Sequence, residues 1–481
     1  MQRRIAAAIA LGLAASSAAH AVYLNPRGLG QVLVYPYYTT NAGQATLFTV
    51  VNTTPNGKAL KMRFHEGYNG RDVLIFNVYL SPYDVWAAEI AQSQSGADAP
   101  ATIQKSDTSC TVPQFTSADF RTFAYTGANI DTGPTSGART REGHFDVIEM
   151  GEVTNAAHGS LDALTHVDGV PADCSQLVNA WTVGGYWTAD PTADLAPPGG
   201  GLYGSESIID VAQGTIYTIN AEAIDGFSAT IQHSQPGANT PDLNTANDGA
   251  DTNTVVTAFV PIAGKMLQLT YDYPVDAVSA LFMASPLYNE YDIEPSIGAQ
   301  SDWLVTFPTK RFYVDPEIVG PTALSPFDEG FGSAVAGESC APFSPLIFDR
   351  EEATVVSGFP EPPVGPGFGF CFESSVLTFN QSASVLGSQL LAGDASRIRS
   401  PFGTDDIPFT SGHLLVDLLS PTHSLTSSNG YVLVGLPAFG FLARSYINAN
   451  VTAGVLANYS GLLPHRASLT CLKANSSAAC P

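Results

Sequence analysis

The sequence has few charged residues, and most of the charges are negative. Asp, Glu, Lys and Arg make up 13% of the 481 residues, about half of their usual share in globular domains. Lys and Arg number 20 against 44 Asp and Glu, which gives a formal net charge of −24. A surface of this sign repels phosphate groups, so the composition disfavours nucleic acid and anionic lipid as partners.

Sequence motifs of catalysis are missing as well. There is no G-x-S-x-G, no H-E-x-x-H and no P-loop, which gives no support to the enzyme classes that use them. One G-x-G-x-x-G string runs from Gly199 to Gly204, but it follows a Pro-rich loop and opens no helix, so we interpret it as a turn. No internal repeat supports a solenoid or propeller. We therefore predict no cofactor, no metal and no catalytic residue.

Long apolar runs are absent after the first 21 residues. This segment carries Arg3 and Arg4, then an apolar run from Ile5 to Ala15, and it ends in Ala19-His20-Ala21. The pattern predicts a signal peptide over residues 1–21, because the apolar run is too short to span a bilayer. Cleavage removes the two arginines, so the net charge of −24 becomes −26. We predict an exported protein without a transmembrane segment, extracellular or at the cell surface, with the periplasm as the alternative.

Cysteine is scarce but even in number. An exported chain meets oxidising conditions, and no Cys-x-x-Cys spacing indicates zinc or redox chemistry. Six cysteines allow 15 pairings, and we expect sequence neighbours to pair because each such pair brackets a turn-rich stretch. The predicted disulfides are Cys110 with Cys174, Cys340 with Cys371, and Cys471 with Cys480. Each would contribute about 2 to 4 kcal/mol.

Alternation of apolar and polar residues begins early in the mature chain. It predicts an antiparallel strand with one buried face (Leu60, Met62, Phe64) and one solvated face (Lys61, Arg63, His65). Turn residues separate this strand from others at 44–52, 72–80 and 84–90, with a fifth candidate at 30–38. We predict a meander of these strands, with residues 72–80 central in a sandwich because both of their faces are apolar.

The rest of the chain repeats this pattern of short strands between Gly, Pro and Asn. Further strands are predicted at residues 144–153, 202–211, 215–223, 254–260, 266–272, 301–307, 375–379, 413–419 and 430–436. Helices are predicted only at residues 175–181 and 275–282. The predicted fold class is all-β, mainly an antiparallel β-sandwich with long disulfide-pinned loops and a few short helices. A main sandwich region would span residues 22–320, and a loop-rich C-terminal β region residues 321–481.

Three groups of residues are candidates for a site, and we favour a structural role for each. Two groups contain histidine: His144 and Asp146 on one strand face with Glu149 on the other, and His158, His166 and Asp168 in a loop. No nucleophile accompanies the first group, and the second matches no zinc spacing. The third is aromatic: Tyr186, Trp187, Trp86 and Trp303 would form a sugar-stacking platform only if they were exposed together, and we favour core packing.

Two acidic segments are candidates for calcium. Glu290, Asp292 and Glu294 would share one face of a strand, but three carboxylates in a row supply only part of a calcium shell. Residues 242–251 look superficially like the calcium loop of an EF-hand. If Gly249 is aligned with the invariant glycine of that loop, however, Ala246 and Val255 fall at positions that require an oxygen ligand. We interpret both segments as solvated polar chain.

Several phrases of the sequence are characteristic when they are taken together. They are Asn25 to Gln31 leading into Tyr35 to Thr39, Leu80 to Trp86, Thr306 to Val314, and Phe348 to Glu352. They resemble an uncharacterised family of exported proteobacterial β-rich proteins with no assigned function. The resemblance spans most of the mature chain and implies export from a Gram-negative cell, and it implies no functional residues.

These observations favour a non-enzymatic exported envelope or extracellular protein with a structural, adhesive or assembly role. One version of this hypothesis is self-association, in which residues 22–39 add a strand to the sheet edge of a neighbouring subunit. The alternative is a secreted carbohydrate-binding or carbohydrate-hydrolysing protein, whose carboxylates would face each other in a cleft beside Trp187 or Trp303.

Overall fold

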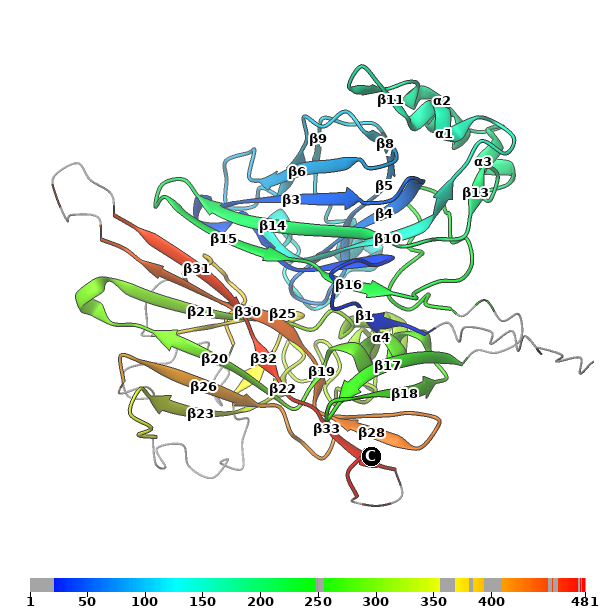
Figure 1. Ribbon diagram of the computed structural model, residues 1–481. Coiled ribbons are helices and arrows are strands. Elements are labelled where there is room, and N and C mark those ends of the chain that lie inside the picture. The colour runs from blue at the N-terminus through cyan, green and yellow to red at the C-terminus, as the bar shows by residue number, and fades with distance from the viewer. Residues whose placement is uncertain are drawn as a thin grey trace, which may run out of the picture.

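Two β-sandwiches make up the structure, one above the other in Figure 1. This computed structural model describes residues 21–247, 249, 255–354, 368–379, 384–392, 409–448, 452, 457–474, 476 and 478–480. Its strands pair antiparallel, its helices are few and short, and three disulfides pin its loops, which confirms the predicted fold class. The predicted signal peptide up to residue 20 and the Pro-rich stretch at 360–367 lie outside the described residues.

The first sandwich consists of an eight-stranded and a six-stranded sheet. The larger sheet has the order β1 (Tyr23–Leu24), β16 (Glu222–Asp225), β2 (Val32–Thr39), β10 (Glu142–Val153), β4 (Gly57–Glu66), β5 (Asp72–Leu80) and β8 (Cys110–Val112), and β13 (Leu195–Ala196) also pairs with β10. The smaller sheet has the order β15 (Thr215–Asn220), β14 (Leu202–Asp210), β3 (Ala45–Asn52), β6 (Val85–Ala91), β7 (Thr102–Gln104) and β9 (Ser117–Asp119). Aromatic side chains fill the space between the sheets, with Phe48 packed against Phe64, Trp86 and Phe145.

The predicted meander is wrong in its pairing, although its strands are present. β4 pairs with β5 in the larger sheet, whereas β3 pairs with β6 in the smaller one. The turns before β4 and before β6 therefore carry the chain from one sheet to the other. Local turn residues predict where a strand ends, but they do not predict in which layer the next strand lies.

The second sandwich has two four-stranded sheets. One has the order β23 (Ser344–Asp349), β26 (Ser411–Asp417), β20 (Pro286–Asp292), β32 (Arg466–Ala467), and the other β25 (Ser374–Thr378), β21 (Ala299–Thr306), β30 (Phe439–Tyr446), β31 (Tyr459–Pro464). Their facing side chains, including Trp303, Leu414 and Leu442, form one core. β20 and β21 thus pair with strands that follow residue 320, so the pairing crosses the boundary expected at residues 320 and 321.

Small sheets surround these layers. They are β11 (His166–Val167) with β12 (Val170–Pro171), β17 (Val256–Ile262) with β18 (Lys265–Tyr271), β19 (Met283–Ala284) with β29 (Leu436–Pro437), β22 (Ala341–Pro342) with β24 (Gly369–Phe370), and β27 (Ser424–Thr426) with β28 (Tyr431–Val434) and β33 (Thr470–Lys473). Together with the two sandwiches they account for the pairing of the named strands.

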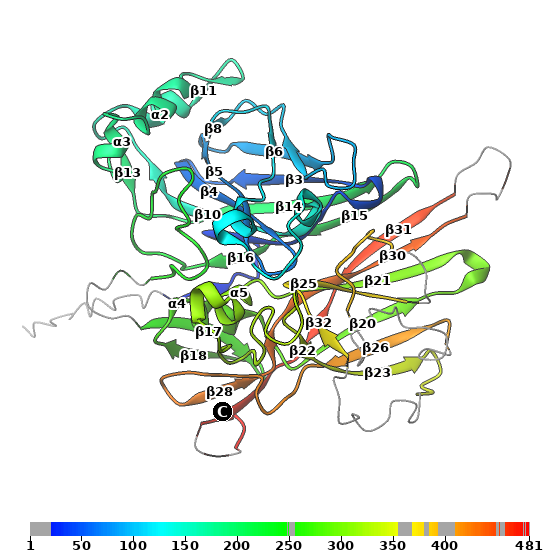
Figure 2. The same cartoon turned by 180° about the vertical axis from the view of Figure 1, so that it is seen from behind.

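Helices fill the ends and the junction of the sandwiches (Figure 2). They are α1 (Ser160–Leu164), α2 (Cys174–Ala180), α3 (Tyr186–Ala189), α4 (Pro274–Phe282), α5 (Arg311–Val314) and α6 (Pro316–Val319), with 3-10 turns η1 (Asn41–Gly43), η2 (Phe123–Tyr125), η3 (Gly127–Asn129), η4 (Gly137–Arg141) and η5 (Pro295–Ile297). α2 and α4 are the two predicted helices. Among the described residues, no helix has the length and apolarity needed to cross a membrane.

The outer face of the eight-stranded sheet is covered by β17, by α4 and by the loop at residues 227–247. Val34 and Ile148 of this face share an apolar core with Ala258 of β17 and with Val278 and Leu281 of α4. The polar face of β4 was expected to be solvated, but Lys61, Arg63 and His65 are buried. Lys61 and Arg63 donate to the carbonyls of Gln235 and Pro241 in the covering loop. The polar face of β4 is thus an internal face of the molecule.

All six cysteines pair as predicted. Cys110 of β8 bonds to Cys174 of α2, Cys340 bonds to Cys371, and Cys471 bonds to Cys480. The bonds close loops of 64, 31 and 9 residues. The first bond joins the edge strand β8 to α2 across the part of the chain that contains β10.

The strand-addition hypothesis does not fit the position of β2, the longest strand of residues 22–39. β2, which makes up half of this segment, pairs with β10 on one side and with β16 on the other. Its residues are all buried. Both of its edges are therefore used within the chain, and β2 has no free edge to offer a neighbouring subunit.

Candidate functional site

The predicted His144 and Asp146 lie in a buried polar cluster at the junction of the two sandwiches. Both residues are on β10, and His65 lies beside them on β4. The His65 Nε2 atom is 2.6 Å from the Asp146 Oδ2 atom, and the His65 and His144 rings stack at 4.8 Å. We call this group, together with the charged residues described next, the junction cluster.

Arginines connect the junction cluster to the second sandwich. Arg63 donates to both carboxylate oxygens of Asp72 at 2.9 Å, and Arg311 of α5 lies 3.3 Å from the same carboxylate. Burial alone would raise the pKa of Asp72, but the positive charges of Arg63 and Arg311 outweigh it and lower the pKa. Arg71 reaches Asp315 at 3.0 Å, which adds an ion pair between the β4–β5 turn and the N-cap residue of α6.

A small cavity lies within the junction cluster, lined in part by His65, Asp146, Arg311 and Glu373. Its volume of about 10 Å³ is close to that of a single water molecule. Burial raises the pKa of Glu373 and lowers that of His144, which favours the neutral form of both groups. The cluster therefore has the residue types of an active site but no room for a substrate.

Glu149, the third member of the predicted group, lies apart from the histidines. Its carboxylate accepts from the Lys58 Nζ atom at 2.8 Å and from the backbone N–H groups of Gly199 and Gly200 at 3.0 and 2.7 Å. The glycine string singled out in the sequence thus wraps an internal carboxylate. Strand β14 begins at Leu202, within the string, so the string does not precede a helix whose N-terminus could bind a phosphate.

The predicted aromatic platform does not form. Trp86, Trp187 and Trp303 are fully buried and lie in three different cores. Tyr186 is half-buried and stacks on the His158 ring at 4.1 Å. The core-packing interpretation is therefore confirmed for the three tryptophans, and none of them has an exposed face to offer a sugar.

The loop histidines are not brought together as ligands. His158 lies against Tyr186, whereas the His166 Nδ1 atom is 2.8 Å from the Ser81 hydroxyl. Asp168 is exposed in a turn, where its φ of 52° is left-handed. In the part of the chain that the structure describes, one group could bring three ligand atoms together: Glu338, Cys340 and Cys371. Its two sulfur atoms form a disulfide, so they are not thiolate ligands.

The acidic candidates for calcium are also separated. Glu290 is exposed and pairs with Arg444 at 2.9 Å, while Asp292 is buried and accepts from the Tyr446 hydroxyl. Strand β20 ends at Asp292, and Glu294 instead caps the 3-10 turn η5. In the loop at 242–251, Asp248 and residues 250–251 lie outside the described residues.

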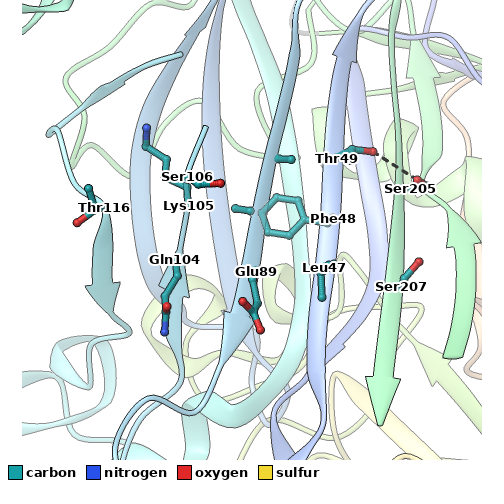
Figure 3. Close-up of a pocket in the computed structure, with 12 residues that line it drawn as sticks. Leu47, Phe48, Thr49, Glu89, Gln104, Lys105, Ser106, Thr116, Ser205 and Ser207 are labelled. Carbon is teal, nitrogen blue, oxygen red and sulfur yellow. Dashed lines mark hydrogen bonds between the residues drawn. The ribbon is translucent and has the colours of Figure 1, made fainter. Parts of the chain in front are cut away.

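A groove that the sequence did not reveal crosses the outer face of the six-stranded sheet (Figure 3). It has a volume of about 500 Å³ and is lined by Leu47, Phe48, Thr49, Ala87, Ala88, Glu89, Gln104, Lys105, Ser106, Thr116, Ser205 and Ser207. We call it the sheet groove. Strand alternation predicts that Leu47, Thr49, Ala87, Glu89, Ser205 and Ser207 face outward, whereas Phe48 and Ala88 belong to the core beneath the groove. The concave shape depends on the twist of the sheet and is not encoded locally.

A second hollow continues the sheet groove toward the disulfide between Cys110 and Cys174. The two hollows share Lys105 and Thr116, and the second has a volume of about 610 Å³. The Lys105 Nζ atom donates to the Asp107 and Ser109 carbonyls at 2.7 and 3.3 Å. The depression therefore extends from β14 to the start of α2.

Comparisons with protein-family models, curated proteins and solved structures found no match. The family resemblance of the sequence phrases remains a prediction. What can be inferred about function rests on the geometry described above.

Proposed function

We propose that this protein is exported and acts by binding, as a non-enzymatic component of the cell envelope or the extracellular space. The observation that carries the proposal is the contrast between the two polar sites. The junction cluster has catalytic residue types but no substrate space, whereas the sheet groove is open and has a single carboxylate, Glu89, among its lining residues. Surfaces of the second kind bind ligands without the paired groups that general acid–base hydrolysis requires.

Three disulfides support export. Disulfides of this kind persist in the periplasm and outside the cell and are rare in the cytosol. The low share of charged residues and the acidic balance fit a soluble exported protein.

The hydrolase form of the alternative has less support. A cleft beside Trp187 or Trp303 was its expected location, and both side chains are fully buried. Glycoside hydrolysis usually needs two carboxyl groups about 5 to 10 Å apart across the substrate. The second hollow has two carboxylates, Asp107 and Asp173. Asp107 accepts hydrogen bonds from the backbone N–H groups of Ala87 and Ser109, and Asp173 caps α2 by accepting from those of Ser175 and Gln176, which gives both a structural role.

Export and binding are tested with the full chain expressed in a Gram-negative host. We expect the protein in the periplasm or medium, with Val22 as its N-terminal residue and no free thiol. Labelled mature protein should bind isolated cell envelopes or extracellular polymer without releasing a soluble product. Retention in the cytoplasm would contradict export, and steady product release that Glu89→Gln abolishes would contradict the non-enzymatic proposal.

A further inference from the structure

We propose that the sheet groove binds a neutral oligosaccharide, lying across the strands of the six-stranded sheet. The inference rests on the proposed binding function and specifies the class of ligand. Its first support is a row of side chains at one level of the sheet, set by direct cross-strand pairing. Ser207 of β14 pairs with Leu47 of β3, Leu47 with Glu89 of β6, and Glu89 with Gln104 of β7.

This row and the next offer the hydrogen-bonding groups that sugar hydroxyls need. Glu89 accepts only, Gln104 both donates and accepts, and the hydroxyls of Ser207, Ser205 and Thr49 do either. Figure 3 shows these side chains projecting from neighbouring strands on one face of the sheet. The hydroxyl groups of Thr49 and Ser205 lie 3.4 Å apart, so their mutual bond is long and easily exchanged for a ligand.

Apolar groups alternate with these polar ones. Leu47 is 42% exposed in the first row, and Ala87 lies in the second. A third row lies next to the groove, outside the residues that line it, and carries Tyr203, 42% exposed, and Val85, 47% exposed, both paired with Val51. A pyranose ring has hydroxyls at its rim and C–H groups on its faces, so it needs both kinds of contact, and an exposed Tyr ring supplies an apolar face with a polar end.

The charge of the groove indicates a neutral ligand. Glu89 and Lys105 are the charged residues among the twelve that line it, and they have opposite signs. The whole chain, in contrast, has a net charge of −24. A polyanionic ligand would meet one cation within a strongly acidic protein, and a polycation would find no row of carboxylates in the groove.

The length of the groove indicates an oligosaccharide rather than a single sugar. Its lining reaches from β14 across β3, β6 and β7 to Thr116, the residue before β9. Neighbouring strands lie about 4.8 Å apart, so the groove spans about 19 Å. The second hollow, which shares Lys105 and Thr116, adjoins this track, and its carboxylates Asp107 and Asp173 accept backbone hydrogen bonds.

A protein partner fits this face less well. Stable protein interfaces have an apolar centre from which charged residues are depleted, whereas Glu89 and Gln104 lie in the middle of the sheet groove. Partner strands add to a sheet at its edge rather than at its face. A second copy of this chain on the groove would appear as a dimer in solution.

The experiment measures binding of the purified mature chain to hexasaccharide probes by isothermal titration calorimetry. The neutral probes are β-1,4-linked glucose, β-1,3-linked glucose, α-1,4-linked glucose and β-1,4-linked N-acetylglucosamine, and the anionic probe is α-1,4-linked galacturonate. Ser207→Tyr fills the groove, and Gln104→Ala removes an amide. Met266→Tyr and Gln268→Ala on exposed positions of β18 are the matched controls.

We expect at least one neutral probe to bind, with affinity at least tenfold weaker in Ser207→Tyr and Gln104→Ala and unchanged in both controls. Binding of none of the neutral probes, a preference for galacturonate, or equal affinity in all variants would overturn the proposal while the binding function could still stand. So would a dimer in light scattering that Ser207→Tyr dissociates, because the groove would then be a contact between copies. Release of reducing ends would instead contradict the proposed function.

Discussion

Replacing Arg139 with methionine tests whether the buried charges at the junction stabilise the fold. The guanidinium is fully buried and binds two carboxylates bidentately, Glu66 at 2.9 and 3.0 Å and Asp131 at 2.7 and 2.8 Å. It also lies over the Tyr125 ring at 4.2 Å. The turn that follows Glu66 accepts hydrogen bonds from the backbone N–H groups of Glu373 and Ser374 of the second sandwich. Loss of Arg139 therefore affects the contact between the two halves.

The expected cost of Arg139→Met is about 4 kcal/mol of unfolding free energy, within the range found when one partner of a buried ion pair is removed. Methionine keeps much of the volume, so the cost comes from the stranded carboxylates. Adding Glu66→Gln should then cost less in the variant than in the wild type, with a coupling of about 1 to 3 kcal/mol. Urea unfolding followed by tryptophan fluorescence and far-UV circular dichroism measures both. Exposed Arg27→Met is the control, and a loss for Arg139→Met below about 1 kcal/mol would refute the reasoning.

Three further predictions concern titration, disulfides and ions. Burial raises the pKa of Asp302 to about 7, so the folded state holds a proton that the unfolded state loses near pH 4, and stability falls as pH rises from about 4 to 7. The unfolding free energy of Asp302→Asn, measured by urea titration, should therefore rise relative to that of the wild type by up to about 4 kcal/mol between pH 4 and 8. A difference between the two proteins that does not depend on pH would contradict this. Replacing both Cys110 and Cys174 with Ser opens a loop of 64 residues and should lower the unfolding free energy by about 4 kcal/mol. The same replacement at Cys471 and Cys480 opens a loop of 9 residues and should lower it by about 2.5 kcal/mol. Equal losses would contradict the explanation by loop entropy. Salt should raise the melting temperature by screening, with calcium no better than magnesium at equal ionic strength, and a saturable calcium-specific rise at low millimolar concentration would show a site.

Much of the strand content could be predicted from the sequence because turn residues mark the ends of short strands. β5 was predicted with its observed bounds, Asp72–Leu80. The disulfides were predicted correctly by pairing each cysteine with the next one along the sequence. β30, Phe439–Tyr446, was missed. Its residues are mostly buried, so it lacks the alternation that indicates a half-exposed strand.

What the sequence could not reveal is which polar faces are internal. Lys61, Arg63 and His65 alternate with apolar neighbours as a solvated strand face would. In the structure the Lys61 Nζ atom donates to the Gln235 carbonyl at 2.6 Å, and Arg63 and His65 bind Asp72 and Asp146. Those partners come from other strands and from a distant loop, so no local pattern indicates them. The sheet groove was missed for the same reason, because its lining comes from strands far apart in the chain.

The few positive charges of the sequence are divided between the interior and the surface of the structure. Among the described residues, several of the few cations are buried with carboxylates or carbonyl groups: Lys58, Arg63, Arg71, Arg139 and Lys310. Carboxylates are buried with them, and because Asp and Glu outnumber Lys and Arg by 44 to 20 in the chain, the outer surface stays acidic. A groove in which one cation and one carboxylate cancel therefore differs from its surroundings. In an electrostatic field that repels anions from most of the molecule, this balance leaves hydrogen bonding and apolar contact as the forces that select a ligand.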